Sequence, residues 1–393
     1  MEKNNFRKIA TITLFESAVQ WYCFLLYGTA AGTVFNKVFF SQTGNGTTAL
    51  ILSYMSFAIG YIAGPFGAVF FGHIGDRKGR KVTMYASLLM MGISTSIIGI
   101  LPPAASAGVG VVIVLQLMRL AQCFGRGILM AYENVPENKR SFYAAIPQIG
   151  LPIGFGLSSI LIAVPTLLLP EDIFFTWGWR IPFLAAIILT VIVIRQKGEM
   201  METEDYKKAQ AKLEAEEAEG KKHKVGFIPM VKGYWKTLLL GCGTRWVDGT
   251  FYNIFIVWIL SYCINWLGMP LIQTYIITII ACIFKIPFTL FGGWCAQKLG
   301  NTRTFVIGAL ASAVLSIPTL KVIELSKGNL AITIIGIVLG WSIAYNLIWA
   351  VISSLWSSYF ETEVRYSGIS FVYHVPSFLV AGMVPTICTL LIN

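Results

Sequence analysis

Ionisable side chains interrupt several long apolar stretches of this sequence, and they are the first candidates for chemistry. Arg245 and Asp248 are three residues apart, which places both on one face of a helix, close enough to pair. Lys285 has no acidic residue within four positions, so it needs a counter-charge from another helix or from a ligand. We predict that Arg245 and Lys285 bind an anionic group and that Asp248 carries a proton. The alternatives are a structural ion pair for the first helix, and a Lys285 side chain that reaches an aqueous interface.

A second group of polar residues follows one face of the first apolar stretch. Glu16 precedes Gln20 by one helical turn, and Tyr27 roughly continues the same stripe. We predict that Gln20 and Tyr27 contact a ligand and that Glu16 is a further proton carrier. The alternative for Glu16 is a position at the boundary of the apolar stretch, paired with Arg7 or Lys8.

His374 and Arg119 complete the set of candidates. His374 precedes Pro376 by two residues and titrates near neutral pH, so it is a third candidate proton carrier, with a hydrogen-bonded packing role as the alternative. Arg119 is a weaker candidate for binding an anion. The chain contains none of the motifs G-x-x-x-x-G-K-[ST], H-E-x-x-H or G-x-S-x-G, so we expect no enzyme activity, no cofactor and no metal site.

The composition shows what kind of element must hold these residues. Hydrophobic residues make up 56% of the chain and charged residues 12%, with a mean hydropathy of +0.69. Soluble domains carry about a quarter charged residues. Apolar blocks such as 51–71, 82–101 and 330–356 reach or exceed the roughly 18 residues that a membrane-spanning helix needs. The sequence therefore predicts an all-α integral membrane protein.

The apolar blocks divide the chain into about eleven predicted spans. They lie at roughly 10–35, 50–71, 82–101, 108–130, 142–168, 178–195, 236–262, 271–296, 304–323, 330–357 and 367–391. The polar stretch 196–235 predicts a solvated connector between an N-terminal six-helix bundle (1–195) and a C-terminal bundle of five spans (236–393). Lys and Arg concentrate in alternate loops, which places the N-terminus in the cytoplasm of a multi-pass protein of the cell membrane. The formal charge of +11 reflects this bias rather than a nucleic-acid partner.

Two short loops occupy equivalent places in the two predicted halves. The first, 65–81, reads PFGAVFFGHIGDRKGRK, and the second, 293–303, reads GWCAQKLGNTR. Parallel duplication of six-helix halves is one architecture of secondary transporters. The first loop resembles in full the signature G-x-x-x-D-R-x-G-R-K of the major facilitator superfamily. This resemblance implies a two-bundle transporter fold and a cytoplasmic latch formed by Gly72, Asp76, Arg77, Gly79, Arg80 and Lys81.

Further segments resemble the metabolite:proton symporter branch of that superfamily, the proline/betaine, 2-oxoglutarate and shikimate permeases. These segments are QWYCFLLYGTAA (20–31), WGWRIPF (177–183), TRWVDGTFY (244–252) and VRYSGISFVY (364–373). Three features depart from that pattern. Gln20 and Cys23 stand where the branch has carboxylates, the fourth span is short, and eleven spans replace twelve.

The resemblance and the charges together predict a secondary transporter that moves a small organic solute, with protons, across the lipid bilayer by alternating access. Within the spans, four cations (Arg119, Arg126, Arg245 and Lys285) outnumber two carboxylates (Glu16 and Asp248), which favours a carboxylate anion as substrate. A zwitterion such as proline or betaine is one alternative, and a transport-incompetent or sensory relative is another. We expect a monomer.

Overall fold

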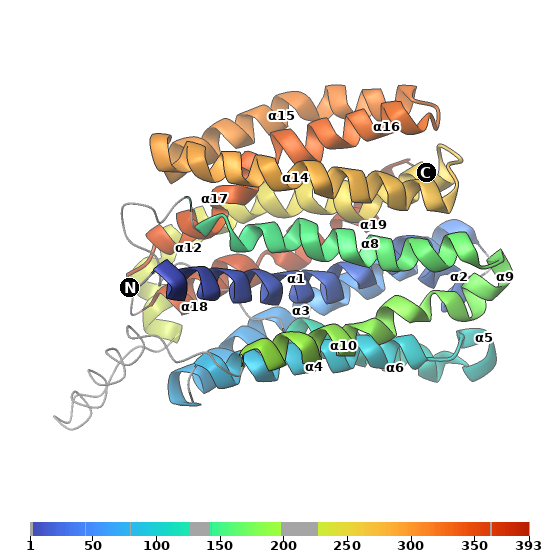
Figure 1. Cartoon of the computed structure of the whole chain (residues 1–393), viewed down its shortest axis with the longest axis horizontal. Coiled ribbons are helices and arrows are strands. Elements are labelled where there is room, and N and C mark those ends of the chain that lie inside the picture. Colours follow the sequence, from blue (N-terminus) through green and yellow to red (C-terminus); the bar gives the residue numbers. More distant parts are fainter. Residues whose placement is uncertain are drawn as a thin grey trace.

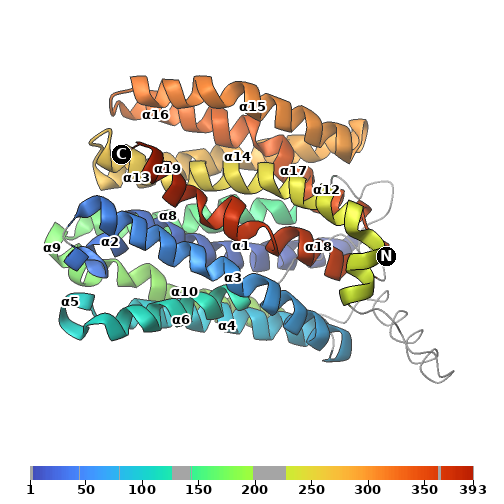
Figure 2. The same ribbon diagram turned by 180° about the vertical axis from the view of Figure 1, so that it is seen from behind.

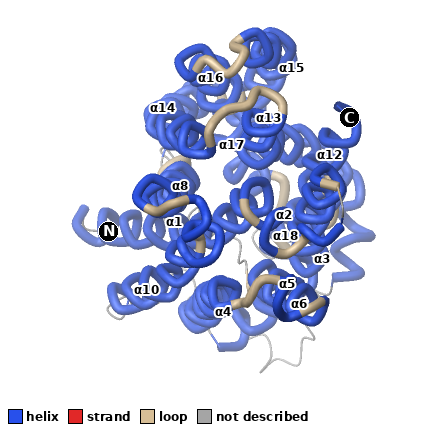
Figure 3. The backbone as a smooth tube through the Cα atoms, turned by 90° about the vertical axis from the view of Figure 1, so that its right-hand side faces the viewer, coloured by secondary structure: helices blue, strands red, loops and turns tan. Residues whose placement is uncertain are grey.

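The computed structural model describes residues 3–43, 45–78, 80–125, 142, 144–197, 227–361 and 364–392. Within these ranges almost every residue is helical and none forms a strand (Figure 3). The helices run along the long axis of the molecule, with the N-terminus at one end and the C-terminus at the other (Figure 1). We call these ends the N-end and the C-end.

In its described residues, the first half of the chain has six long helices and three short ones. The long helices are α1 (Lys3–Thr33), α3 (Gly46–Lys78), α4 (Arg80–Ile100), α6 (Val109–Phe124), α8 (Gly150–Leu168) and α10 (Arg180–Lys197). The short helices α2 (Phe35–Val38), α5 (Ala104–Ala107) and α9 (Glu171–Ile173) lie at the C-end (Figure 1). A π-helical turn, η5 (Phe174–Gly178), leads into α10.

The second half contains longer helical passes that π-helical segments interrupt. The helices are α12 (Phe227–Asn253), α13 (Ile259–Asn265), α14 (Leu271–Leu299), α15 (Asn301–Leu325), α16 (Leu330–Ile337), α17 (Asn346–Ser358), α18 (Arg365–His374) and α19 (Val384–Ile392). The π-helical segments η6 (Ile254–Trp258), η7 (Val338–Ala344) and η8 (Phe378–Gly382) join α12 to α13, α16 to α17, and α18 to α19. Such segments change the direction in which the following side chains point from the helix axis, and they are frequent at functional sites.

The all-α membrane prediction is confirmed. Each predicted span contains helix, and seven helices in the described ranges are long and apolar enough to cross a membrane. The observed helices extend beyond several predicted spans. The largest difference is α12, which begins at Phe227 within the predicted connector and leaves helical geometry at Tyr234 (φ −115°, ψ 20°) before it enters the bundle. Residues 198–226 of the connector lie outside the described residues, and the three domain limits stay a prediction.

The helices form one elongated bundle in which the two halves of the chain lie side by side. α14, α15 and α16 lie on one side, and α4, α6 and α10 lie on the other (Figures 1 and 2). The halves meet where α8 packs against α14 and where α3 packs against α18, η8 and α19. Small residues permit close approach within each half: a Cβ at Gly154 of α8 would lie 2.2 Å from the backbone oxygen of Ala18 in α1, and one at Gly308 of α15 would lie 2.9 Å from the backbone nitrogen of Ile348 in α17.

Hydrogen bonds join the two halves toward both ends. Near the C-end, the Tyr54 hydroxyl donates to Ser261 Oγ (2.5 Å), which in turn donates to the backbone oxygen of Gly32 (2.7 Å). Toward the N-end, Trp349 Nε1 donates to the backbone oxygen of Gln148 (3.0 Å). In this structure the two halves are therefore in contact both near the C-end and toward the N-end.

Candidate functional site

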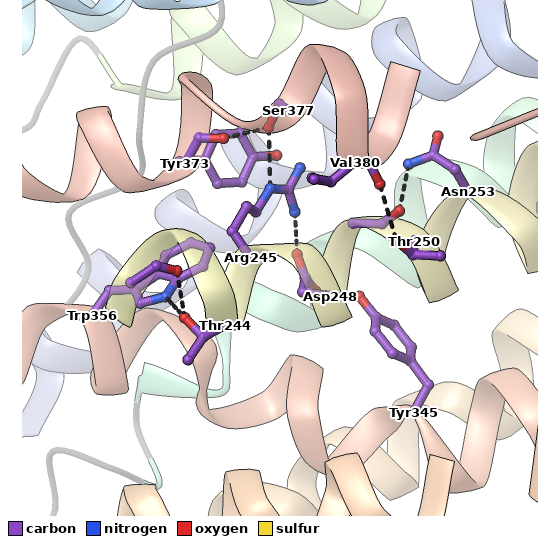
Figure 4. A network of polar contacts seen from close by, with 12 residues as sticks. Thr244, Arg245, Asp248, Thr250, Asn253, Tyr345, Trp356, Tyr373, Ser377 and Val380 are labelled. Atoms are coloured by element: carbon purple, nitrogen blue, oxygen red, sulfur yellow. Dashed lines mark hydrogen bonds and ion pairs between the residues drawn. The ribbon is translucent and has the colours of Figure 1, made fainter. Parts of the chain in front are cut away.

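The Arg245–Asp248 pair lies on the buried face of α12, as the three-residue spacing predicts. Arg245 Nη1 donates to Asp248 Oδ2, and Arg245 Nε donates to Ser377 Oγ (3.1 Å), at the residue before η8 (Figure 4). The guanidinium also lies over the Tyr373 ring, with Cζ 4.2 Å from the ring centroid. Both charged side chains are buried. This pair therefore ties α12 to the last helical pass of the chain.

The second carboxylate oxygen of Asp248 has its own partner. The Tyr345 hydroxyl, at the junction of η7 and α17, donates to Asp248 Oδ1 over 2.6 Å (Figure 4). Asp248 thus accepts hydrogen bonds at both carboxylate oxygens, one from its own helix and one from the residue before α17.

Lys285 lies on α14 and is completely buried. Its Nζ donates to Asn346 Oδ1 (2.9 Å) and to the backbone oxygen of Trp341 (3.4 Å). Nζ also lies over two aromatic rings, 4.8 Å from the centroid of Trp341 and 4.6 Å from that of Tyr345. In the described part of the chain no carboxylate pairs with this ammonium. The counter-charge expected from another helix is thus not found there, and its partners are a neutral amide, a carbonyl and two rings.

Asn346 holds the lysine through a closed set of hydrogen bonds. Its Oδ1 also accepts from Thr289 Oγ1 (3.2 Å), and its Nδ2 donates to the backbone oxygen of Lys285 (2.9 Å) and to Thr289 Oγ1 (3.1 Å). Our sequence analysis missed Asn346, which lies 61 positions from Lys285. The available signal was a polar amide inside the apolar block 330–356.

Arg119 and Tyr27 meet in the core of the first half. The Arg119 guanidinium lies over the rings of Phe24, Tyr27 and Phe57, with Cζ between 4.3 and 4.6 Å from their centroids. Its Nη1 donates to Gln122 Oε1, whereas its Nη2 has no hydrogen-bond partner among the described residues. The side chain is completely buried. Arg119 is therefore a second buried cation without a carboxylate partner in the described ranges.

Glu16 and Gln20 form a buried pair on α1. Gln20 Nε2 donates to Glu16 Oε1 over 3.3 Å, and about 5% of each residue is exposed. Their one-turn spacing therefore places them on a common face, as predicted. The side chains of Arg7 and Lys8, the alternative partners of Glu16, lie outside the described residues.

His374 lies at the contact between the two halves. A Cβ added at Gly64 of α3 would come 2.3 Å from His374 Nδ1, so only a glycine leaves room for this imidazole. α18 ends at His374, and the regular helix is interrupted before Ser377, as Pro376 predicts. His374 thus lies away from α14, in the seam between α3 and the last pass.

The predicted latch is only partly described. Gly72, Asp76 and Arg77 belong to the last turns of α3, and Arg80 and Lys81 begin α4. Gly79 and the side chains of the other five lie outside the described residues.

A cavity of about 400 Å³ lies between the two halves near the C-end. α1, α2, α8, α9 and η5 line it from the first half, and α13 and α14 from the second. At its rim Lys37 pairs with Glu171 (3.3 Å) and lies over the Phe175 ring. Thr33 lines the cavity, and its hydroxyl contacts that of Tyr275 (3.1 Å). A polar contact that joins the two halves thus lies beside the cavity.

Comparison with known protein families decides the family. The sequence profile of the Major Facilitator Superfamily matches residues 21–384, nearly the whole chain. The chain belongs to the major facilitator superfamily. Members of this superfamily are transporters, so the predictions of a transporter fold and of a protein that is not an enzyme are confirmed.

Individual relatives of this superfamily member agree with the predicted branch. The chain is 32% identical to the inner membrane metabolite transport protein YhjE of Escherichia coli, over 98% of this chain and 87% of the relative. It is 30% identical to the shikimate transporter of the same organism, over 98% and 88%. A proline/betaine transporter of Salmonella typhimurium is 27% identical, over 100% and 79%. This chain is therefore a multi-pass membrane transporter of the metabolite type.

Solved structures support the fold independently. The proton:xylose symporter XylE of the major facilitator superfamily, bound to 6-bromo-6-deoxy-D-glucose, superposes with a TM-score of 0.76 at 16% identity, over 100% of this chain and 90% of that chain. A partially occluded inward-open form of XylE from Escherichia coli gives 0.74 at 15% identity, over 97% and 91%. At such low identity the likeness concerns the fold alone.

Proposed function

We propose that this transporter moves a small organic anion, a mono- or dicarboxylate, together with protons by alternating access. The observation that carries the proposal is the environment of Lys285. Its ammonium is completely buried, yet its described partners are neutral. Burying a charge costs several kcal/mol unless a partner compensates it. A carboxylate that approaches Nζ would supply the missing charge.

The balance of buried charge points in the same direction. Among the described residues, the buried cations are Arg119, Arg245 and Lys285, and the buried carboxylates are Glu16 and Asp248, so the cations are in excess by one. Because Asp248 pairs with Arg245, it does not neutralise Lys285 directly. An anionic substrate would restore neutrality in the second half of the chain. Arg126, the fourth cation of the sequence count, lies outside the described residues.

Asp248 is the carboxyl that we assign to the coupling proton, with Glu16 and His374 as further candidates. It is buried, and one of its oxygens is held by the same tyrosine that covers Lys285. A proton on Asp248 would weaken its pairing with Arg245 and thereby the tie between α12 and the last pass. On this proposal, protonation of Asp248 would change how helices of the second half pack.

The predicted latch and the orientation complete the proposal. We place the N-terminus in the cytoplasm and the protein in the cell membrane, because Lys and Arg concentrate in the loops of that side and because one relative is an inner membrane protein. On this view the loop between α3 and α4 controls the cytoplasmic closure. We expect Asp76→Asn to slow flux while binding stays largely intact. An equal loss of binding and flux would remove the latch role.

Uptake into proteoliposomes tests the function. The panel contains labelled succinate, shikimate, proline and glycine betaine, each with and without an inward proton gradient and with a protonophore control. Gradient-dependent accumulation of a carboxylate supports the proposal. The names of the relatives include shikimate, a carboxylate, and proline and betaine, which are zwitterions. Accumulation of the zwitterions alone would favour that alternative, whereas binding without flux would favour a sensory protein.

A further inference from the structure

One aromatic residue contacts both the proposed substrate cation and the proposed proton carrier. The Tyr345 ring centroid lies 4.6 Å from Lys285 Nζ. The Tyr345 hydroxyl points toward Asp248 (Figure 4) and donates to its Oδ1 over 2.6 Å. The residue is completely buried. Its ring also stacks on Phe251 of α12, with 6.5 Å between ring centroids and 9° between ring planes. The two functional charges therefore share one rigid side chain as a common neighbour.

The backbone around Tyr345 positions it for this double contact. Tyr345 follows directly on the π-helical segment η7, and Asn346, the next residue, begins α17 and binds Lys285. Two adjacent residues thus hold the lysine, one with an amide and one with a ring face. An anion that reaches Nζ must replace one of these contacts, because Lys285 has no exposed surface.

We propose that Tyr345 is the positioning residue that couples substrate binding to protonation, which deepens the proposed function and rests on it. An anion bound to Lys285 displaces the Tyr345 ring. The hydroxyl then leaves Asp248 Oδ1, and this carboxylate, with one donor fewer, takes up a proton. The proton comes from water on the proton-rich side and leaves to water on the other side, while Tyr345 keeps its own hydroxyl proton throughout.

The coupling is reciprocal. A protonated Asp248 holds the tyrosine hydroxyl less strongly, so the ring moves away from Lys285 more readily and the anion binds more tightly. Among the described residues, the charged and titratable groups near Asp248 are Arg245 on its own helix, Tyr345 and, beyond Tyr345, Lys285 on α14. Tyr373 of α18 and Tyr61 of α3 lie near Arg245, and Tyr252 of α12 lies near Tyr345. Of these groups, Tyr345 contacts both Lys285 and Asp248 in the described structure.

Tyr345→Phe tests this role, because it removes the hydroxyl and keeps the ring over Lys285. The matched control is Tyr22→Phe, which removes an equally buried hydroxyl that donates to the backbone oxygen of Pro182 (2.6 Å) within the first half. Both variants and the wild type are assayed with whichever of succinate, shikimate, proline or glycine betaine the wild type takes up. The two readouts are the ratio of uptake with and without a proton gradient, and the rate of solute exchange without a gradient.

We expect the gradient ratio of Tyr345→Phe to fall to about one, while exchange stays within about threefold of the wild type. The control should keep both properties. A Tyr345→Phe variant with an unchanged gradient ratio overturns the inference. Loss of both exchange and accumulation in this variant alone also overturns it, because Tyr345 would then be a structural requirement. Uptake by the wild type that ignores the gradient refutes the proposed symport itself, and this inference with it.

Discussion

Replacement of Lys285 by methionine separates a ligand-binding role from a structural role. Methionine has a similar length without the charge, so Lys285→Met removes the ammonium and leaves the packing of α14 nearly intact. In the variant, Thr289 can turn its single hydroxyl hydrogen from the backbone oxygen of residue 285 (2.9 Å) to Asn346 Oδ1 (3.2 Å), because Asn346 Nδ2 still donates to that backbone oxygen. The substitution therefore creates no buried polar atom without a partner at this amide.

The expected change in stability follows from opposing contributions of similar size. Removal of a buried charge relieves a desolvation penalty of several kcal/mol. It also loses a hydrogen bond of the charged amine, about 1.5–3 kcal/mol, and contacts with two rings, about 0.5–2 kcal/mol each. These contributions nearly cancel, so we expect the unfolding temperature in detergent to change by only a few degrees.

The expected change in binding is much larger. Loss of a charge-assisted hydrogen bond of about 1.5–3 kcal/mol raises the Kd of an anionic substrate roughly 10- to 150-fold. Thermal unfolding and equilibrium binding of the transported panel anion measure the two effects. Lys298→Met is the control, because Lys298 lies on the same helix over the Trp294 ring (4.1 Å) but is exposed. Unchanged binding in Lys285→Met, or a large fall in unfolding temperature with binding retained, would refute the reasoning.

Two further substitutions test the contacts between the halves. Gly64→Ala places a Cβ 2.3 Å from His374 Nδ1 and should reduce stability by about 1–3 kcal/mol. The control in thermal unfolding is Gly243→Ala, where the added Cβ meets nothing within 4 Å, so this variant should be as stable as the wild type or slightly more stable. Equal unfolding temperatures of the two variants would mean that the His374 imidazole moves aside at no cost. Tyr54→Phe removes a hydroxyl that joins the halves near the C-end, a loss of about 0.5–1.5 kcal/mol. The population of the form that is open at this end should therefore rise roughly 2- to 10-fold. The alkylation rate of Ile264→Cys in the cavity reports this opening, and an unchanged rate would count against Tyr54 as part of the closure.

The sequence alone predicts the structural features that depend on residues close together in the chain. Long apolar blocks suffice for the spans, and a three-residue spacing suffices for the Arg245–Asp248 pair, because helical geometry alone brings these side chains together. Pro376 likewise predicts the interruption after His374.

The surroundings of Lys285 depend on tertiary packing instead. Its partners Trp341 and Asn346 lie 56 and 61 positions away, and the π-helical segment η7 determines which residues face α14. No local rule predicts where a helix takes up an extra residue per turn. The start of α12 also differs from the prediction, since residues 227–233 are helical although they lie in the polar stretch that we predicted as a solvated connector.

The contact between Trp21 and Trp349 gives the protein a built-in optical reporter. The two indoles come from opposite halves of the chain, and their ring centroids are 5.3 Å apart at an interplanar angle of 75°. Indoles this close share their electronic excitation, which produces a paired signal in circular dichroism that vanishes when the rings separate. The chain has 11 tryptophans, so the difference spectrum between the wild type and Trp349→Phe separates the contribution of Trp349, its pairing with Trp21 included, from that of the others. Movement of one half against the other can then be followed in real time without any attached label.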